Sequence, residues 1–381
     1  MSHNPFIDYY EKHNIIPVRQ DIENLSQHFA RRESLYTLLG IPFGLLKGKN
    51  IIEFGPGSGD NAIYTASLQP ALYVLVDGNR NSITLIHDKI ENGFFPVTVK
   101  NELYYANLFD YQDTRLFDLV LCEGALPGQT QPREFLAKIA SFVAPQGGML
   151  VITTTTAGSL LAEVCRRMFK PLLYNPAKTL QENVTQFVAL FKPDLDSLTG
   201  MSRLYEDWVL DTILHPWKNT VFSIPETLAA LGDDFQPYGS SPAFFTDWRW
   251  YKAIPEDIAS RTDLFINIYY QNLINFIDYR ITPVQCDPVI AQEVEFLCQK
   301  AFDVHIPIWE ENHQEAVFEV FIPIIKDISN LVRTISPATT LALNDFIQAL
   351  YEFKQTNQLE TNSFHTFFGR GQQYLSMIKR V

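Results

Sequence analysis

The most restrictive feature of the sequence is a glycine-rich bend that joins an apolar run to a helix-like segment. The run 50–54 leads directly into Gly55, Gly57 and Gly59, and the segment 60–68 follows at once. Glycine has no Cβ, so these positions let the backbone turn sharply and let a ligand approach the main chain. A strand, a tight turn and a helix in this order predict the start of a βαβ unit with a ligand site at the turn.

Apolar runs and amphipathic stretches go on alternating after this unit, which predicts an α/β fold with a parallel sheet. Short, wholly apolar runs suit strands that are covered on both faces, and the amphipathic stretches between them suit crossover helices. The expected strands are 50–54, 71–77, 103–109, 117–123 and 148–155, and the expected helices are 60–68, 79–92 and 132–143.

The α/β domain is predicted to span residues 46–254. A capping box opens a helix at 223–232, and two aromatic-rich strand candidates, 234–242 and 246–254, follow it. The stretch of about 158–220 then becomes an insertion after the fifth strand, and it is a candidate lid over a substrate.

Helical segments flank this domain on both sides. Residues 1–45 are expected to form an N-terminal helical cap or lid, because the apolar residues of 21–39 have helical spacing. Residues 255–381 are expected to form an all-helical C-terminal domain. Its predicted helices are 256–280, 288–303, 309–334, 337–356 and 360–379.

Charge and cysteine content narrow the class of partner. The formal net charge of −13 argues against a nucleic acid or an anionic membrane, because phosphate binding needs a concentrated positive surface. The basic pairs Arg31-Arg32 and Arg166-Arg167 are interpreted as solvated helix faces. The 4 cysteines lack metal-ligand spacing, so we expect free, mostly buried thiols and no metal. No signal peptide and no apolar run of ~20 residues is present, which favours a cytoplasmic protein.

The acids beside the glycine bend indicate the charge of the ligand. Glu53 precedes the bend, and Asp60 stands where a dinucleotide-binding GxGxxG motif has its third glycine. Two carboxylates here would repel a pyrophosphate, whereas they suit a ligand with a sulfonium and an ammonium group. Asp77 ends the next strand and is placed to accept hydrogen bonds from the hydroxyls of a ribose.

At these motifs the sequence resembles the class I S-adenosylmethionine-dependent methyltransferases. The resemblance rests on IIEFGPGSG, LYVLVDGN, FDLVLCEGALP and APQGGMLVITT, which follow one another in the family's order over roughly residues 46–156. It implies a Rossmann-like seven-stranded methyltransferase sheet, with S-adenosylmethionine as cofactor.

The resemblance also implies the residues that hold the cofactor. Gly55, Gly57 and Gly59 would wrap its methionine part, with Glu53 bracing the loop or meeting the amino group. Asp77 would hold the ribose, with Gly78 and Asn79 nearby. Asn107 and Leu108 would flank the adenine, although the family often has Asp where Asn107 stands. Glu123 would face the methyl group.

Three side chains are candidates for catalysis, since a hydroxyl acceptor needs a base. Glu123 follows the fourth strand, where ligands of α/β proteins bind. His28 lies in the predicted cap helix, and its alternative interpretation is an exposed helix face. His215 lies in the predicted insertion, and its alternative is a helix C-terminus that the helix dipole favours.

The expected reaction is methylation, on oxygen or nitrogen, of a small-molecule or sugar-containing acceptor. The sequence GALPG stands after the fourth strand in place of an NPPY-like tetrad, which disfavours amino-methyltransferases of nucleobases or protein amides. The alternatives are an NAD(P)-dependent oxidoreductase and a non-catalytic, cofactor-binding scaffold. The C-terminal helices are candidates for a homodimer contact.

Overall fold

The chain forms two compact units, and each draws on separate stretches of the sequence. The computed structural model describes residues 20, 22–127, 129–199, 201, 203–216, 221–253, 259–281 and 284–380. Unit 1 comprises Met1–Thr154, Asn219–Ile268 and Gln372–Val381, and unit 2 comprises Thr155–Lys218 and Tyr269–Gly371. The predicted insertion at 158–220 therefore falls mainly in unit 2, together with most of the predicted C-terminal helices.

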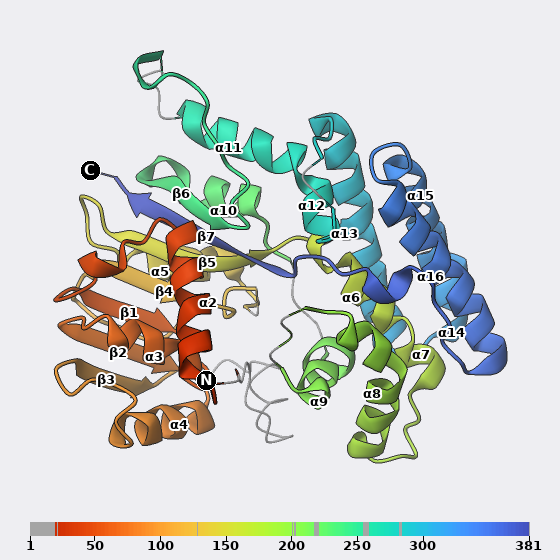
Figure 1. The fold of residues 1–381 in the computed structure, drawn as a ribbon, viewed down its shortest axis with the longest axis horizontal. Helices are drawn as coiled ribbons and strands as arrows, with labels where there is room; N and C mark the ends of the chain where they lie inside the picture. Colours follow the sequence, from red (N-terminus) through yellow and green to blue (C-terminus); the bar gives the residue numbers. More distant parts are fainter. Residues whose placement is uncertain are drawn as a thin grey trace. The chain divides into compact units, whose positions relative to one another are not determined.

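Unit 1 is built on a seven-stranded mixed sheet, which confirms the predicted fold class (Figure 1). The strand order is β3-β2-β1-β4-β5-β7-β6; the pairs among the first five of these strands are parallel, and β6 and β7 pair antiparallel. The strands are β1 (Asn50–Phe54), β2 (Leu72–Asp77), β3 (Lys100–Tyr105), β4 (Leu119–Cys122), β5 (Met149–Thr155), β6 (Phe235–Ser241) and β7 (Gln372–Lys379).

Apolar helix faces cover both sides of this sheet. On one side, a core cluster joins α2, α3 and α4 to inward side chains of the strands, among them Ile51, Tyr73 and Leu121. On the other side, Phe54 lies 6.4 Å from Phe135 of α5, measured between ring centroids. The helices are α2 (Leu25–Leu38), α3 (Asp60–Ser67), α4 (Arg80–Glu91), α5 (Pro132–Ala140), α10 (Ile224–Leu231) and α11 (Ala259–Gln271), the last of which continues into unit 2. The predicted capping box of α10 is confirmed.

The final strand corrects two sequence predictions. Residues 372–379 form β7 rather than the end of a helix over 360–379, and β7 takes the place in the sheet that we expected 246–254 to fill. The described residues 246–253 form no strand: Trp248 is 91% exposed, and the Asp247 carboxylate accepts a hydrogen bond from the Arg249 backbone N–H, which bends the chain. The last residue of the predicted strand, 254, lies outside the described residues.

Unit 2 is helical throughout its described part. Its longest helices are α13 (Pro288–Glu310), α16 (Pro337–Thr356) and α8 (Leu180–Asp196). The helices predicted at 288–303 and 337–356 are confirmed, and the former runs on through Pro307. The shorter helices are α6 (Leu161–Arg167), α7 (Lys170–Leu173), α9 (Tyr205–Trp208), α12 (Leu273–Ile277), α14 (Gln314–Ala316) and α15 (Ile322–Val332), with π-helical turns at Val209–Leu214 and Val317–Phe321.

Buried arginines hold the interior of unit 2, so the interpretation of Arg166-Arg167 as a solvated face is wrong. Both side chains are 0% exposed. Arg166 pairs with Asp194 at 2.8 Å and donates to the Phe367 carbonyl at 2.8 Å. Arg167 donates to the Thr212 carbonyl at 2.7 Å. Each guanidinium thus donates to backbone carbonyls that lack a partner within their own turn. The spacing of apolar residues cannot predict such a contact.

The cysteines agree with the prediction: Cys122, Cys165, Cys286 and Cys298 are free and buried. Among the described residues, no helix combines the length and the apolar character that crossing a membrane requires.

Candidate cofactor and active site

The glycine bend between β1 and α3 has the backbone conformation that only glycine adopts readily. Gly55, Gly57 and Gly59 have φ angles of 74°, 57° and 76°. A Cβ on Gly55 would lie 2.8 Å from Cβ of Ala125, and a Cβ on Gly59 would lie 2.6 Å from Cγ1 of Ile86. The bend is therefore a cradle that any larger residue would fill or distort.

Asp77, at the end of β2, ties this bend to the neighbouring strand. Its Oδ2 accepts from the Gly57 backbone N–H at 3.0 Å, and its Oδ1 accepts from the Asn79 N–H at 2.7 Å. Burial raises the pKa of the carboxyl to about 6. Gly78, between Asp77 and Asn79 in the chain, is half-buried. The predicted ribose acid is thus held at the bend itself.

Asn79 carries a donor that the described part of the chain leaves without a partner. Its side chain caps α4 by accepting from the Asn81 N–H at 2.9 Å, which leaves its Nδ2 buried and unpaired. A buried donor without a partner costs free energy, which a ligand oxygen would remove. The position beside Asp77 fits a ribose hydroxyl, as the sequence predicts.

Glu53 is a buried acid beneath the bend. Its carboxylate accepts a short hydrogen bond from the Tyr73 hydroxyl. Burial raises the pKa of Glu53, and the negative charge of Glu123 raises it further, while Arg32 lowers it. A buried carboxyl with a raised pKa is difficult to ionise alone, and a positive charge on a ligand beside it would favour its ionised form.

Glu123, just past β4, is the meeting point of three elements. It accepts from Arg32 of α2 at 2.8 Å and 2.5 Å, and from Tyr374 of β7 at 3.4 Å. Asn61 of α3 donates to it at 3.3 Å. Arg32 and Tyr374 were not predicted as site residues. The Arg31-Arg32 pair was interpreted as a solvated face, but Arg32 is buried and its fork matches the carboxylate.

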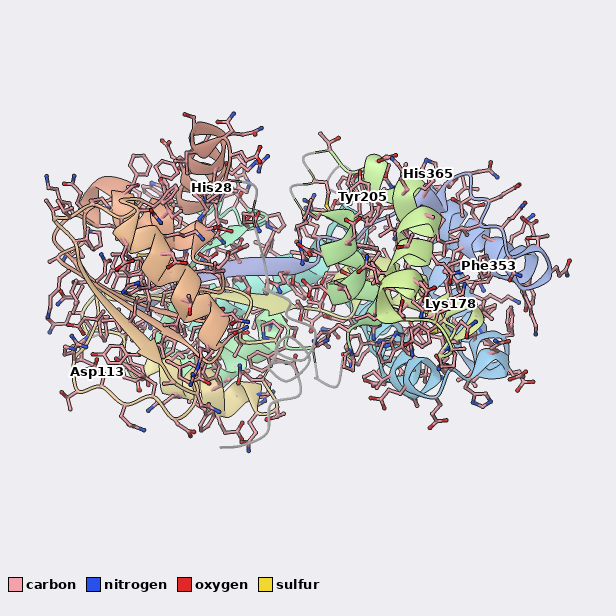
Figure 2. All side chains as sticks on the ribbon, turned by 90° about the horizontal axis from the view of Figure 1, so that it is seen from below. His28, Asp113, Lys178, Tyr205, Phe353 and His365 are labelled. Atoms are coloured by element: carbon pink, nitrogen blue, oxygen red, sulfur yellow. The ribbon has the colours of Figure 1, made fainter. Side chains whose placement is uncertain are left out.

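His28 of α2, which Figure 2 labels, is buried against the bend, so its interpretation as an exposed side chain is wrong. It is 3% exposed, and its Nε2 lies 3.0 Å from the carbonyl oxygen of Asp60. A carbonyl can only accept, so Nε2 carries the proton and donates. Burial lowers the pKa of His28, which keeps the ring neutral and leaves Nδ1 as its basic atom. Catalysis by His28 stays a prediction.

The residues that follow β3 lie at the other side of the bend. Asn107 is half-buried, and its side-chain oxygen accepts from the Phe109 N–H at 2.9 Å. The Leu108 Cδ1 atom lies 3.7 Å from where a Cβ of Gly55 would stand. The structure therefore brings the predicted adenine-flanking pair to the glycine bend.

His215, the third catalytic candidate, belongs to unit 2, whereas Glu123 and His28 belong to unit 1. The residue is 0% exposed, and its carbonyl accepts from Arg167 at 3.0 Å. Burial, with the charge of Arg167 as the second cause, lowers the pKa of its imidazole to about 3. A ring this difficult to protonate is a weak base, and its catalytic role stays a prediction.

The neutral His215 makes the stability of the protein depend on pH. Its folded pKa lies below the unfolded value of about 6.5, so the stability it contributes is complete above pH 6.5 and is lost as pH falls. Between pH 7.5 and pH 5 we expect a loss of about 2 kcal/mol in the free energy of unfolding from this residue. Urea unfolding of the protein and of His215→Gln at both pH values measures the difference; equal pH dependence would contradict it.

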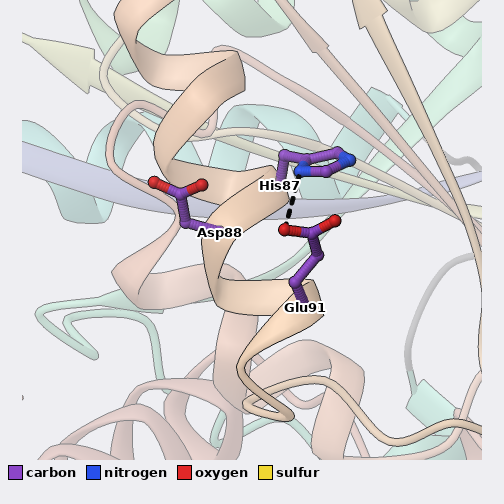
Figure 3. Close-up of side chains that lie close together, drawn as sticks. All are labelled: His87, Asp88 and Glu91. Carbon is purple, nitrogen blue, oxygen red and sulfur yellow. Dashed lines mark ion pairs between the residues drawn. The ribbon is translucent and has the colours of Figure 1, made fainter.

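One surface group combines possible metal ligands. His87, Asp88 and Glu91 share an exposed face of α4, and their ligand atoms lie within 4.8 Å of one another (Figure 3). His87 Nδ1 stands 3.6 Å from the Glu91 carboxylate, an i,i+4 pair. Such pairs are common on solvated helices, and we assign no metal to this one.

Comparisons with known proteins identify a domain of this kind in the chain. Residues 26–191 match a family model described as a methyltransferase domain. A comparison with curated proteins finds no match.

The chain is also similar to several solved structures, among them the following three. PKMT2 from Rickettsia typhi in complex with AdoHcy is 19% identical, with a TM-score of 0.42, over 62% of this chain and 49% of that one. The N-methyltransferase NodS from Bradyrhizobium japonicum WM9 is 16% identical, with a TM-score of 0.33, over 41% and 76%. The [4+2]-cyclase SpnF is 12% identical, with a TM-score of 0.38, over 96% and 86%. The chain thus spans about half the length of the Rickettsia protein.

The matched domain contains the whole glycine bend, Asp77 and Glu123, and S-adenosylmethionine is the cofactor of such domains. Asp60, whose carboxylate stands at the first turn of α3, disfavours the pyrophosphate of a nicotinamide dinucleotide. The match over residues 26–191 agrees with the resemblance to the class I S-adenosylmethionine-dependent methyltransferases and with S-adenosylmethionine as the cofactor.

Proposed function

We propose that this protein transfers the methyl group of S-adenosylmethionine to an oxygen or nitrogen atom of a small-molecule or sugar-containing acceptor. The observation that carries the proposal is electrostatic. Glu53, Asp77 and Glu123 surround the glycine bend, with Arg32 paired to one of them. Such a site favours a cationic ligand over a phosphate.

The residues of unit 1 divide the work of binding. Asp77 and the free Nδ2 of Asn79 would hold the ribose, and the bend would hold the methionine part, with Glu53 below it. Leu108 would pack against the adenine. The bound cofactor supplies an electrophilic methyl group, so the remaining task of the chain is to orient the acceptor for an in-line displacement.

The role of Glu123 depends on the acceptor. Both of its oxygens accept hydrogen bonds from Arg32, so a proton taken up by Glu123 would weaken this ion pair. A neutral amine needs orientation alone, whereas a hydroxyl group needs a base. We propose Glu123 as the base for a hydroxyl acceptor, and otherwise as the residue that holds α2 over the site.

A labelling experiment tests the acceptor class. The protein is incubated with S-adenosylmethionine labelled in its methyl group and with a cell extract separated into small-molecule and macromolecular fractions. We expect the label in a small molecule or glycan, and none with Asp77→Ala. Label in protein or nucleic acid would contradict the acceptor class. Binding of the cofactor without any transfer would favour a non-catalytic scaffold. The helices of unit 2 would then offer the surface for a partner, and we propose the same helices for a contact between two copies of the chain.

A further inference from the structure

Asp60, the first residue of α3, joins three separate stretches of chain at the glycine bend. Its side chain is 5% exposed. Its Oδ2 accepts from the Ser58 hydroxyl at 2.7 Å and from the Gln20 backbone N–H at 2.9 Å, and its Oδ1 lies 3.1 Å from Lys89 Nζ of α4. The negative charge also stands at the amino end of α3, where the helix dipole favours it.

Lys89 also forms a hydrogen bond with the backbone of the same bend. Its Nζ donates to the Ser58 carbonyl at 2.9 Å, and its side chain is 14% exposed. Ser58, the residue between Gly57 and Gly59, is therefore held by its hydroxyl and by its carbonyl. Because the flanking glycines have no side chains to fix them, these bonds restrict a segment that would otherwise be free to change conformation.

The N-terminal part of the chain is attached to the same point. The His28 ring donates to the Asp60 carbonyl at 3.0 Å, so α2 is anchored at the residue whose side chain anchors Gln20. One residue therefore fixes both the bend and the helix that covers it.

We propose that Asp60 and Lys89 are positioning residues for the cofactor. The two side chains hold the glycine bend in its binding conformation and keep residue 20 beside it. The helix α2 is held through His28 by the backbone carbonyl of Asp60, so it depends on the position of the same residue. The Asp60 carboxylate has Ser58 and Gln20 at Oδ2 and Lys89 at Oδ1, so we assign to it the role of holding Ser58 rather than that of binding the ligand. This inference rests on the proposed function, because it requires that the bend binds S-adenosylmethionine.

Variants that remove a charge but keep the size of the side chain test the role of the Asp60–Lys89 ion pair. Asp60→Asn keeps the size of the side chain and an acceptor for Ser58, but it removes the charge. Lys89→Met removes the cation, and Lys89→Arg restores it. The matched control is Asp118→Asn, which breaks the exposed Lys49–Asp118 pair at the opposite, amino edge of the strands. Calorimetry gives the Kd for S-adenosylmethionine, hydrogen exchange follows the amides of α2, and thermal melting reports stability.

We expect Asp60→Asn and Lys89→Met each to weaken cofactor binding by about tenfold and to speed exchange in α2. Lys89→Arg and Asp118→Asn should bind like the unmodified protein. Unchanged Kd and exchange in both variants would overturn the inference, as would a loss of affinity that follows a lowered melting temperature and is not rescued by Lys89→Arg. If the unmodified protein does not bind S-adenosylmethionine, the proposed function fails instead.

Discussion

Replacing Asp77 with asparagine should weaken the binding of S-adenosylmethionine by about tenfold to a hundredfold at pH 8, because a hydrogen bond to a charged group contributes about 1.5–3 kcal/mol. The carboxylate can accept from both ribose hydroxyls, whereas an amide offers a single oxygen. The amide nitrogen would also meet the Gly57 or Asn79 N–H that now donates to the carboxylate. Calorimetric titration measures the Kd.

The pH dependence of this variant separates a direct contact from damage to the fold. The pKa of Asp77 is about 6, so the affinity of the unmodified protein should fall as pH drops through 6, and that of Asp77→Asn should not. The stability effect has the opposite sign. A folded pKa above the unfolded value means that ionisation costs stability as pH rises from about 4 to 6. Without cofactor, the stability of the unmodified protein should therefore fall as pH rises from about 4 to 6, and Asp77→Asn should lack this pH dependence.

Asp88→Asn is the matched control for Asp77→Asn, since Asp88 is an exposed acid on α4. It should change neither the Kd nor its pH dependence. An Asp77→Asn protein that binds the cofactor as tightly as the control, at pH 8 and at pH 5.5, would show that Asp77 does not contact the ribose.

The parts of the site that the sequence predicted are those where local chemistry determines the structure. The bend between β1 and α3 needs glycine for its φ angles, and Asp77 follows from the end of an apolar run. Both signals lie within one βαβ unit, so no distant contact can override them. The same holds for the capping box of α10.

Distant contacts explain what the sequence did not predict. Arg32 and Tyr374 come together only because α2 and β7 both reach the end of β4, and nothing local to either residue indicates an ion pair or a hydrogen bond there. The buried Arg166 likewise depends on Asp194 and on carbonyls far along the chain. The expected homodimer stays a prediction, because the structure contains a single chain.

The strand β7 was missed for a different reason. Over a segment this short, the positions of Gln372, Leu375 and Met377 fit both the helical and the strand period of apolar residues. The long helices before the segment then favour the prediction of a further helix. The pairing with β6 decides the outcome: the backbone N–H and carbonyl groups of 372–379 are satisfied by a sheet whose other members lie far away in sequence.

Placing a charge on β7 should therefore unfold unit 1. Leu375 is 0% exposed within the sheet, and Leu375→Asp would bury an unpaired carboxylate and leave a cavity. We expect a loss of about 4 kcal/mol or more, which is a large share of the stability of an ordinary domain. Gln372→Asp is the matched control, because Gln372 lies on the same strand with its side chain exposed. Thermal melting followed by circular dichroism compares the two.

The same substitution should abolish cofactor binding, although Leu375 is not a predicted ligand of the cofactor. The β7 strand lies between β5 and β6, so the sheet that carries the glycine bend is complete only when the last residues of unit 1 have joined it. Such non-local pairing folds slowly and leaves the earlier strands with an open edge until it forms. A Leu375→Asp protein that melts and binds S-adenosylmethionine like Gln372→Asp would show that 372–379 does not belong to this sheet.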